Sequence, residues 1–139
     1  MKKVILFFIL ATISISMCGC SDFGFNPTGQ WKFVSDNVYD DNGTLIDSAL
    51  AEDNSILGDM VMVFQKSGIG YIDVIGVRSE EFTYSYDNNS ITITYLANEY
   101  HDEIEAQFKP SDDGKNIVRS LTTVENGITY VEEFLYKRV

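Results

Sequence analysis

The alternation of apolar and polar residues first becomes regular at Gly29-Gln30-Trp31-Lys32-Phe33-Val34. In an extended chain, Trp31 and Phe33 fall on one side and their neighbours on the other, so this spacing predicts a strand over residues 30–35. Trp31 is the only Trp of the chain. We therefore expect this first strand to place its two rings at the centre of the core.

The same period of two recurs from Met60 to the C-terminus, where short apolar runs alternate with turn-forming residues. It is clearest where Phe82, Tyr84 and Tyr86 alternate with polar neighbours. Glu125-Asn126-Gly127 is the strongest hairpin signal, because Asn and Gly tolerate the left-handed backbone of a tight turn. The predicted strands cover residues 60–65, 69–77 (with Gly76 as a bulge or close contact), 81–86, 90–96, 100–109, 116–124 and 128–138.

A different pattern fills the segment between the first two strands. Residues 36–44 are polar and predict a loop. Beyond them, apolar residues recur at roughly helical spacing, with Ile46 and Leu50 four residues apart. This spacing predicts one or two helical turns that Gly58 would end. A packed loop is the alternative, because the segment also contains several Asp and Asn residues.

About eight short strands with tight turns and no long helix predict an all-β domain built as an antiparallel up-and-down meander. With 45% hydrophobic residues, the chain has enough apolar material for one core. A meander removes its exposed edges most economically by closing on itself. We therefore predict a small β-barrel over residues 29–139, with an open sandwich as the alternative.

The first 19 residues have the organisation of a signal peptide, in which a basic start precedes an apolar run too short for a comfortable membrane span. Met17-Cys18-Gly19-Cys20 then resembles the lipobox of bacterial lipoproteins, and the small residue before Cys20 favours it over Cys18. The resemblance implies cleavage before Cys20 and fatty acylation there, which attaches a protein firmly to a membrane. An ordinary secreted protein cleaved nearby is the alternative.

Residues 20–28 would then form the lipidated Cys and a short tether. Ser21-Asp22 resembles a brief form of the polar or acidic signal that sends some lipoproteins of the Bacteroides type to the cell surface. We therefore expect an outer-membrane lipoprotein, with display on the cell surface as one outcome.

Charge excludes two classes of partner. The formal net charge is −11, from 21 acidic and 10 basic residues, and the pI is near 4.3. Nucleic acid and anionic lipid surfaces both require clustered Lys and Arg, so we expect neither as a binding target of the domain. No Cys follows Cys20, and His101 is the only His. The sequence therefore indicates no disulfide, metal or cofactor.

No pattern indicates catalysis. The chain has no Gly-x-Ser-x-Gly, no evident Ser-His or Cys-His arrangement and no Gly-rich phosphate loop. Acid pairs for glycoside hydrolysis could be drawn from Glu103, Glu105, Glu132 and Glu133, but outward, solvated roles fit most of them better. A calcium loop counted from Asp41 reaches Glu52 at its twelfth position, yet places Gly43 and Leu45 at ligand positions. We expect a plain turn there, and no enzyme.

Aromatic side chains are the remaining candidates for a binding site. Lining a barrel with Tyr would suit a partly apolar ligand, because the ring is apolar and the hydroxyl polar. The same residues would also serve as ordinary cross-strand pairs within a core. The candidate lining residues are Tyr84, Tyr95, Phe108 and Tyr130.

The Gly-x-Trp of the first strand, the run of hairpins and the terminal Tyr136-Lys137-Arg138 resemble the small lipocalin-like lipoproteins of Bacteroides-type bacteria. The resemblance implies that Trp31 closes one end of the barrel and that Arg138 (or Lys137) lies across it. Fold alone does not fix function, but our leading expectation is a membrane-anchored, non-catalytic protein that binds a small apolar ligand or an extracellular partner. A structural or interaction subunit of an envelope complex, without a ligand, is the alternative.

Overall fold

The computed structural model describes residues 24–139. The predicted signal peptide and Cys20 lie outside the described residues. Within the described range, no helix is long and apolar enough to cross a membrane. The strands are β1 (Gly29–Tyr39), β2 (Leu45–Leu50), β3 (Met60–Phe64), β4 (Ile69–Val74), β5 (Val77–Tyr86), β6 (Ile91–Tyr95), β7 (Ile104–Pro110), β8 (Asn116–Glu125) and β9 (Ile128–Arg138), and the helical turns are η1 (Ala51–Asp53) and α2 (Ser55–Gly58).

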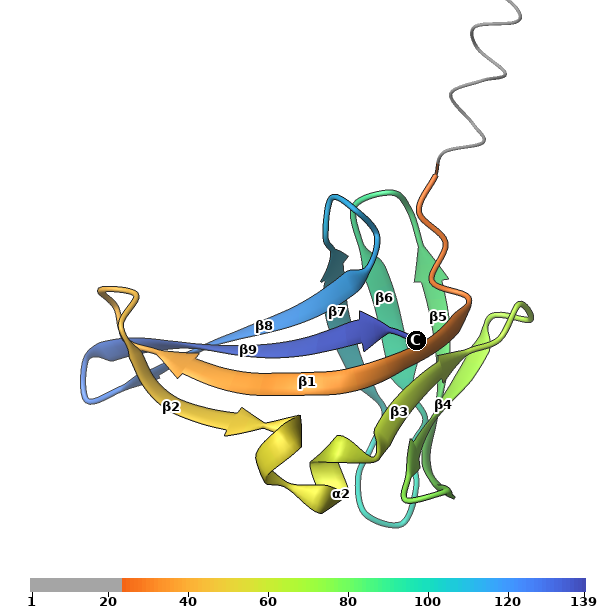
Figure 1. The fold of residues 1–139 in the computed structure, drawn as a ribbon, viewed down its shortest axis with the longest axis horizontal. Helices are drawn as coiled ribbons and strands as arrows, with labels where there is room; N and C mark the ends of the chain where they lie inside the picture. Colours follow the sequence, from red (N-terminus) through yellow and green to blue (C-terminus); the bar gives the residue numbers. More distant parts are fainter. Residues whose placement is uncertain (1–23) are drawn as a thin grey trace, which may run out of the picture.

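Eight of these strands close into an antiparallel barrel (Figure 1). From β3 onward each strand pairs with the next one in the chain, and β9 returns to pair with β1, whose other edge pairs with β3. The prediction of an all-β, up-and-down barrel is therefore confirmed, and the shape is that of a small lipocalin-like barrel.

The ninth strand, β2, corrects two expectations. β1 continues to Tyr39 through residues predicted as a loop, and Leu45–Leu50 pairs with it where a helix was predicted. The helical spacing was misleading because residues four apart share one face of a strand as well as one face of a helix. Helical turns follow only at η1 and α2, where Asn54 Oδ1 accepts the backbone N–H groups of Ile56 and Leu57 at 3.0 and 3.1 Å.

Two other strand boundaries differ from the prediction, each because of a local turn. Ile75 and Gly76 both have positive φ, 53° and 73°, and form the tight turn between β4 and β5, so Gly76 is not a bulge. β7 begins at Ile104 because Asn98 Oδ1 accepts the N–H groups of Tyr100 and His101 and holds them in a loop.

The interior of the barrel is filled by large apolar side chains. Phe64 meets Phe82 edge to face, with 5.2 Å between ring centroids, and Phe33 meets Tyr136 in the same way at 5.7 Å. The largest side chains that are fully buried are Trp31, Phe64, Phe82, Phe108, Met62, Ile91, Ile93, Ile117 and Pro27.

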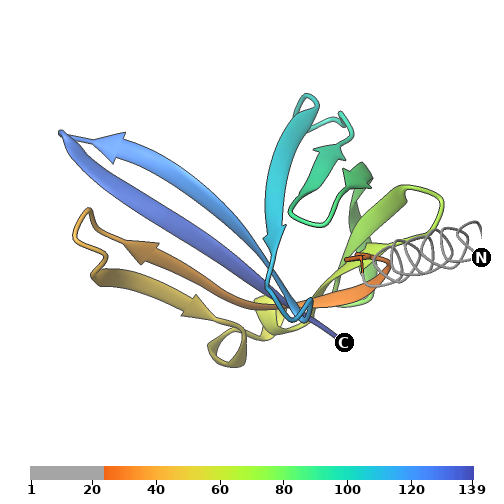
Figure 2. The same ribbon diagram turned by 90° about the horizontal axis from the view of Figure 1, so that it is seen from above.

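β1, β8 and β9 continue beyond the barrel, β2 joins them there, and the four strands project to the left in Figures 1 and 2. We call this extension, residues 35–50 and 119–134, the arm; its strands lie in the order β2-β1-β9-β8. It separates from the barrel because β7 and β8 pair only at Lys109–Val118 and Pro110–Ile117. The face of β9 that carries Tyr136 and Phe134 points toward the core in the barrel and continues into the arm. We call this face of the arm the inner face.

Gly70 provides a test of this packing. A Cβ added there would lie 2.2 Å from the Phe82 ring and 2.5 Å from the Val63 carbonyl oxygen. We expect Gly70→Ala to lower the free energy of unfolding by about 3 kcal/mol, because a backbone atom cannot move aside cheaply. Gly76→Ala is the control, because nothing lies within 4 Å of its Cβ position. Only the strain of a positive φ then lowers the free energy of unfolding, by about 1 kcal/mol. Urea denaturation compares the two, and equal losses would contradict the packing described.

Candidate functional site

Trp31 and Arg138 meet at the end of the barrel where the chain arrives from Gly24. They are partners in the β1–β9 register, and Arg138 Cζ lies 4.3 Å from the centroid of the Trp31 ring. The indole Nε1–H donates to Pro27 O at 2.7 Å, so the buried ring keeps its polar group satisfied. Lys137, the other cation considered from the sequence, is exposed on the opposite face of β9.

The Arg138 guanidinium also ties together segments that are far apart in sequence. It donates from Nη2 to Asn26 O at 2.6 Å, from Nη1 to Thr28 O at 3.0 Å and from Nε to Gly114 O at 3.4 Å. Burial lowers its pKa, because desolvation penalises the charged form. The three carbonyl groups and the aromatic face offset that penalty.

The four aromatic residues predicted as ligand-lining do not surround one cavity. Tyr95 and Phe108 are buried members of the core. Tyr84 is half-buried, packs against Phe64 and donates its hydroxyl to the backbone oxygen of Gln65. Tyr130 lies half-buried on β9 in the arm.

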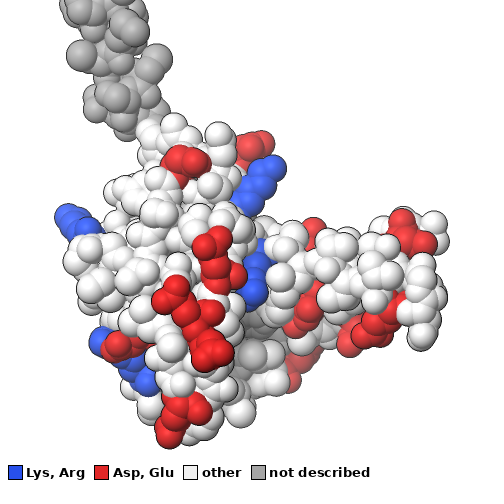
Figure 3. Space-filling model, turned by 180° about the vertical axis from the view of Figure 1, so that it is seen from behind, with Lys and Arg blue, Asp and Glu red and all other residues white. Residues whose placement is uncertain are grey.

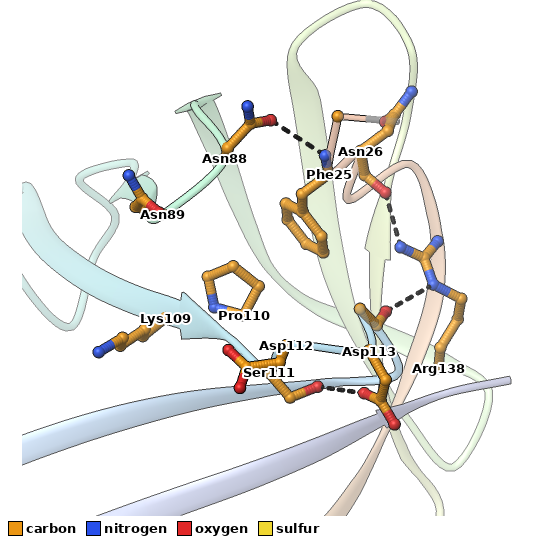
Figure 4. A pocket seen from close by; sticks show the side chains of 12 residues that line it. Phe25, Asn26, Asn88, Asn89, Lys109, Pro110, Ser111, Asp112, Asp113 and Arg138 are labelled. Atoms are coloured by element: carbon orange, nitrogen blue, oxygen red, sulfur yellow. Dashed lines mark hydrogen bonds between the residues drawn. The ribbon is translucent and has the colours of Figure 1, made fainter. Parts of the chain in front are cut away.

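A polar cleft of about 630 Å³ lies beside the Trp31–Arg138 closure (Figure 4). Three segments wall it: the incoming chain at Phe25, the turn between β5 and β6 at Asn88, and the turn between β7 and β8 that follows Pro110. Phe25 N–H donates to Asn88 Oδ1 at 3.1 Å and joins two of these walls. No local pattern in the sequence predicts this cleft, because its residues come together only when the barrel closes.

The inner face of the arm carries charged groups that sequence reasoning did not single out. Asp36 and Arg119 lie opposite Phe134 in the register, and Phe134 packs against the core. Arg119 Cζ lies 5.9 Å from the Phe134 ring centroid. Asp36 Oδ1 and Arg119 Nε are both buried, with no hydrogen-bond partner among the described residues.

Asp36 belongs to a pair of carboxyl groups. Its pKa is raised to about 6 by burial, by the charge of Glu132, by a hydrogen bond with Glu132 and by the charge of Asp47. Each of these influences penalises the ionised form. Asp36 therefore takes up a proton at mildly acidic pH.

The pKa values of two buried phenols and of one imidazole are also raised. Burial raises the pKa of Tyr95 and of Tyr136, while the charge of Arg119 lowers both. A hydrogen bond to the Asp102 carbonyl and another to Glu80 raise the pKa of His101. His101 Nε2 lies 3.1 Å from the Glu80 carboxylate, so this contact fastens the loop after β6 to β5.

Several apolar side chains are exposed at the free end of the arm. Leu45 and Ile46 are 52% and 51% exposed, and Val124 and Ile128 are 67% and 42% exposed. Close by, Tyr39 and Val131 help to line a shallow hollow of about 570 Å³.

Acidic groups surround these side chains. Seven acidic residues and one basic residue give the arm a formal charge of −6. In Figure 3 acidic groups are spread along the projecting arm at the right. The acidic residues are Asp36, Asp40, Asp41, Asp47, Glu125, Glu132 and Glu133.

Several acidic candidates from the sequence lie in a turn or on the exposed surface. Asp40 Oδ1 accepts the N–H groups of Asn42 and Thr44 at 2.9 Å, which makes this segment a plain turn. Glu103 and Glu105 are exposed on the surface. Within residues 24–139, no group of three or more His, Cys, Asp or Glu side chains is placed to hold a metal ion.

Comparison with known proteins adds no relative: no family model, curated protein or solved structure matches the chain. The fold and the surfaces described above therefore define the molecule only as an all-β barrel protein with a projecting arm.

Arg138 can be tested by stability. We expect Arg138→Ala to lower the free energy of unfolding by about 3 kcal/mol, because three carbonyl groups lose a charged donor and Trp31 loses its cover. Arg138→Lys keeps the charge but not the planar fork, so its loss is intermediate. Lys137→Ala is the control and changes stability by less than about 0.5 kcal/mol. Urea denaturation followed by Trp31 emission measures all three, and a neutral Arg138→Ala would contradict this role.

The raised pKa of Asp36 predicts that the stability of the fold depends on pH. Its folded-state pKa lies above the ordinary value, so its contribution to stability is complete below about pH 4 and is lost as pH rises through 6. Between pH 5 and 7.5 the wild type should therefore lose about 1 kcal/mol more than Asp36→Asn, after allowance for solvent screening. Urea denaturation at both pH values tests this, with Asp41→Asn as control. Parallel curves for wild type and Asp36→Asn would refute it.

Proposed function

We propose that the protein is a non-catalytic, lipid-anchored lipoprotein of the outer membrane that binds another protein through the free end of its arm. The observation that carries the proposal is the exposure of Leu45, Ile46, Val124 and Ile128 on an extension that packs against the barrel only at its base. Exposed apolar side chains gathered at the free end of such an extension favour a role in interaction with another molecule.

The charge of the arm defines the partner's chemistry. An apolar centre with acidic groups around it complements a surface with an apolar centre and a basic rim, and opposite charges accelerate the encounter of two such surfaces. Two arms that each carry a charge of −6 repel one another, so a different protein is favoured over a second copy.

The filled barrel supports a protein partner over a small apolar ligand. Trp31, Phe64 and Phe108 occupy the interior that such a ligand would require. The second candidate, a small apolar ligand, has support at one place only, the inner face of the arm, where Tyr130 and Phe134 are half-buried.

The anchor rests on the sequence. The lipobox-like Met17-Cys18-Gly19-Cys20 supports lipidation at Cys20, and three residues then separate Cys20 from Gly24, the first described residue. The absence of a nucleophile motif supports a binding role over a catalytic one.

Site-specific photo-crosslinking in the native envelope tests the partner. A photoreactive residue at Val124 should form a covalent adduct with one protein other than a second copy, and Ile46→Lys in the same chain should lower the yield about tenfold, as for a central contact residue. The yield should also fall with added salt, because the charges are screened.

Ile75 provides the matched control. It is 58% exposed, but it lies in the turn between β4 and β5, away from the arm. Ile75→Lys should leave the Val124 adduct unchanged, and a photoreactive residue at Ile75 should not capture the same protein. A lipid or metabolite as the adduct would favour the second candidate, and self-adducts alone would contradict the proposal.

A further inference from the structure

We propose that the polar cleft beside Phe25, at the opposite end of β9 from the arm, is a binding site for a neutral saccharide. The cleft has the size of a small-molecule site, about 630 Å³, and is assembled from three separate segments (Figure 4). The inference does not depend on the proposed protein partner.

Hydrogen bonds among the wall residues hold the walls of the cleft in place without filling the cleft itself. Arg138 fixes the incoming chain through the carbonyls of Asn26 and Thr28. In the turn after β7, Asp113 Oδ1 accepts Ser111 Oγ–H at 2.6 Å and Lys115 N–H at 3.0 Å. A frame fixed before binding lowers the entropy cost of holding a ligand.

Several polar groups that border the cleft remain unused. The side chains of Asn89, Lys109 and Asp112 have no hydrogen-bond or ion-pair partner among the described residues, and all three are exposed. Asn88 accepts the Phe25 N–H through Oδ1, and its amide NH₂ has no described partner. Together these groups offer both donors and acceptors.

The charges of the residues that line the cleft disfavour an anionic ligand. Lys109 and Asp112 are the charged groups that take no part in the hydrogen bonds holding the walls of the cleft, and their opposite charges cancel. Asp113 stands beside the cleft as well, so a phosphate or carboxylate would meet carboxylate oxygens. A neutral ligand rich in hydroxyl groups can donate to Asp112 and accept from Lys109 and the amides at once.

The cleft also has an apolar wall. Figure 4 shows the Phe25 ring pointing into the space that Pro110, Asn88 and Asn89 border. A saccharide ring presents C–H groups on its face and hydroxyl groups around its edge. This combination matches one aromatic surface surrounded by amide and charged groups.

The test uses the full chain in detergent micelles, titrated with neutral hexoses, N-acetylhexosamines and their disaccharides. Trp31 emission reports binding, because its ring centroid lies 6.1 Å from that of Phe25. We expect at least one of these saccharides to bind, and Asn89→Ala and Asp112→Ala each to weaken binding about tenfold, the value of one lost polar contact. Glu103→Ala, an exposed change outside the cleft, should leave the affinity unchanged.

Vesicles of phosphatidylcholine with and without a neutral glycolipid distinguish the source of the saccharide. Binding of the free sugar supports a soluble glycan, and binding to the glycolipid vesicles alone supports a lipid-borne one. The proposal is overturned if neither form binds, if both variants bind as the wild type does, or if inorganic phosphate displaces the sugar.

Discussion

The guanidinium of Arg138 is the contact on which the closed structure depends. It covers the Trp31 ring and donates to carbonyl groups of the incoming chain and of the turn after β7, so one side chain joins both ends of the domain. An Arg is required, because only its planar fork can direct several donors to separate acceptors while its face rests on an indole. The pairing of Trp31 with Arg138 also lies at the end of the β1–β9 ladder, which closes the barrel.

Closure at this end leaves β1 and β9 free to continue past the barrel at the other. β1 changes its neighbour on one edge from β3 to β2, and the register shift between Phe33 and Ser35 comes just before that change. β8 leaves β7 after two residue pairs and follows β9 instead. The acidic side chains on the arm disfavour pairing of its edge strands β2 and β8 with other copies, a common protection of exposed sheet edges.

The sequence was informative where one face of a strand is buried. Phe82, Ile93 and Phe108 alternate with polar residues, and that period placed the barrel strands within a few positions. It also placed the two arm strands β8 and β9, but it was uninformative for residues 36–50, where no period of two marks the strands. Ile46 and Leu50 fit a helix and a strand equally.

The functional surfaces were less accessible to sequence reasoning than the strands. The Trp31–Arg138 pair followed from resemblance, and no local pattern could join residues more than a hundred positions apart. The cleft beside Phe25 and the charged inner face of the arm depend on the same long-range closure, as the contact of Phe25 with Asn88 illustrates. Buried groups such as Asp36 and Arg119 look like ordinary surface charges until the register places them opposite Phe134.

The size of the barrel explains why the proposed binding surfaces lie outside it. Eight short strands bury few large side chains, and a domain of this size has a total stability of about 5–15 kcal/mol. An empty chamber of about 300 Å³ in place of those side chains would cost about 7 kcal/mol, at the usual penalty for cavity volume. Filling the interior with Trp31, Phe64 and Phe108 avoids that cost. The surfaces proposed for recognition, the polar cleft at one end and the arm at the other, are ones that the core does not need.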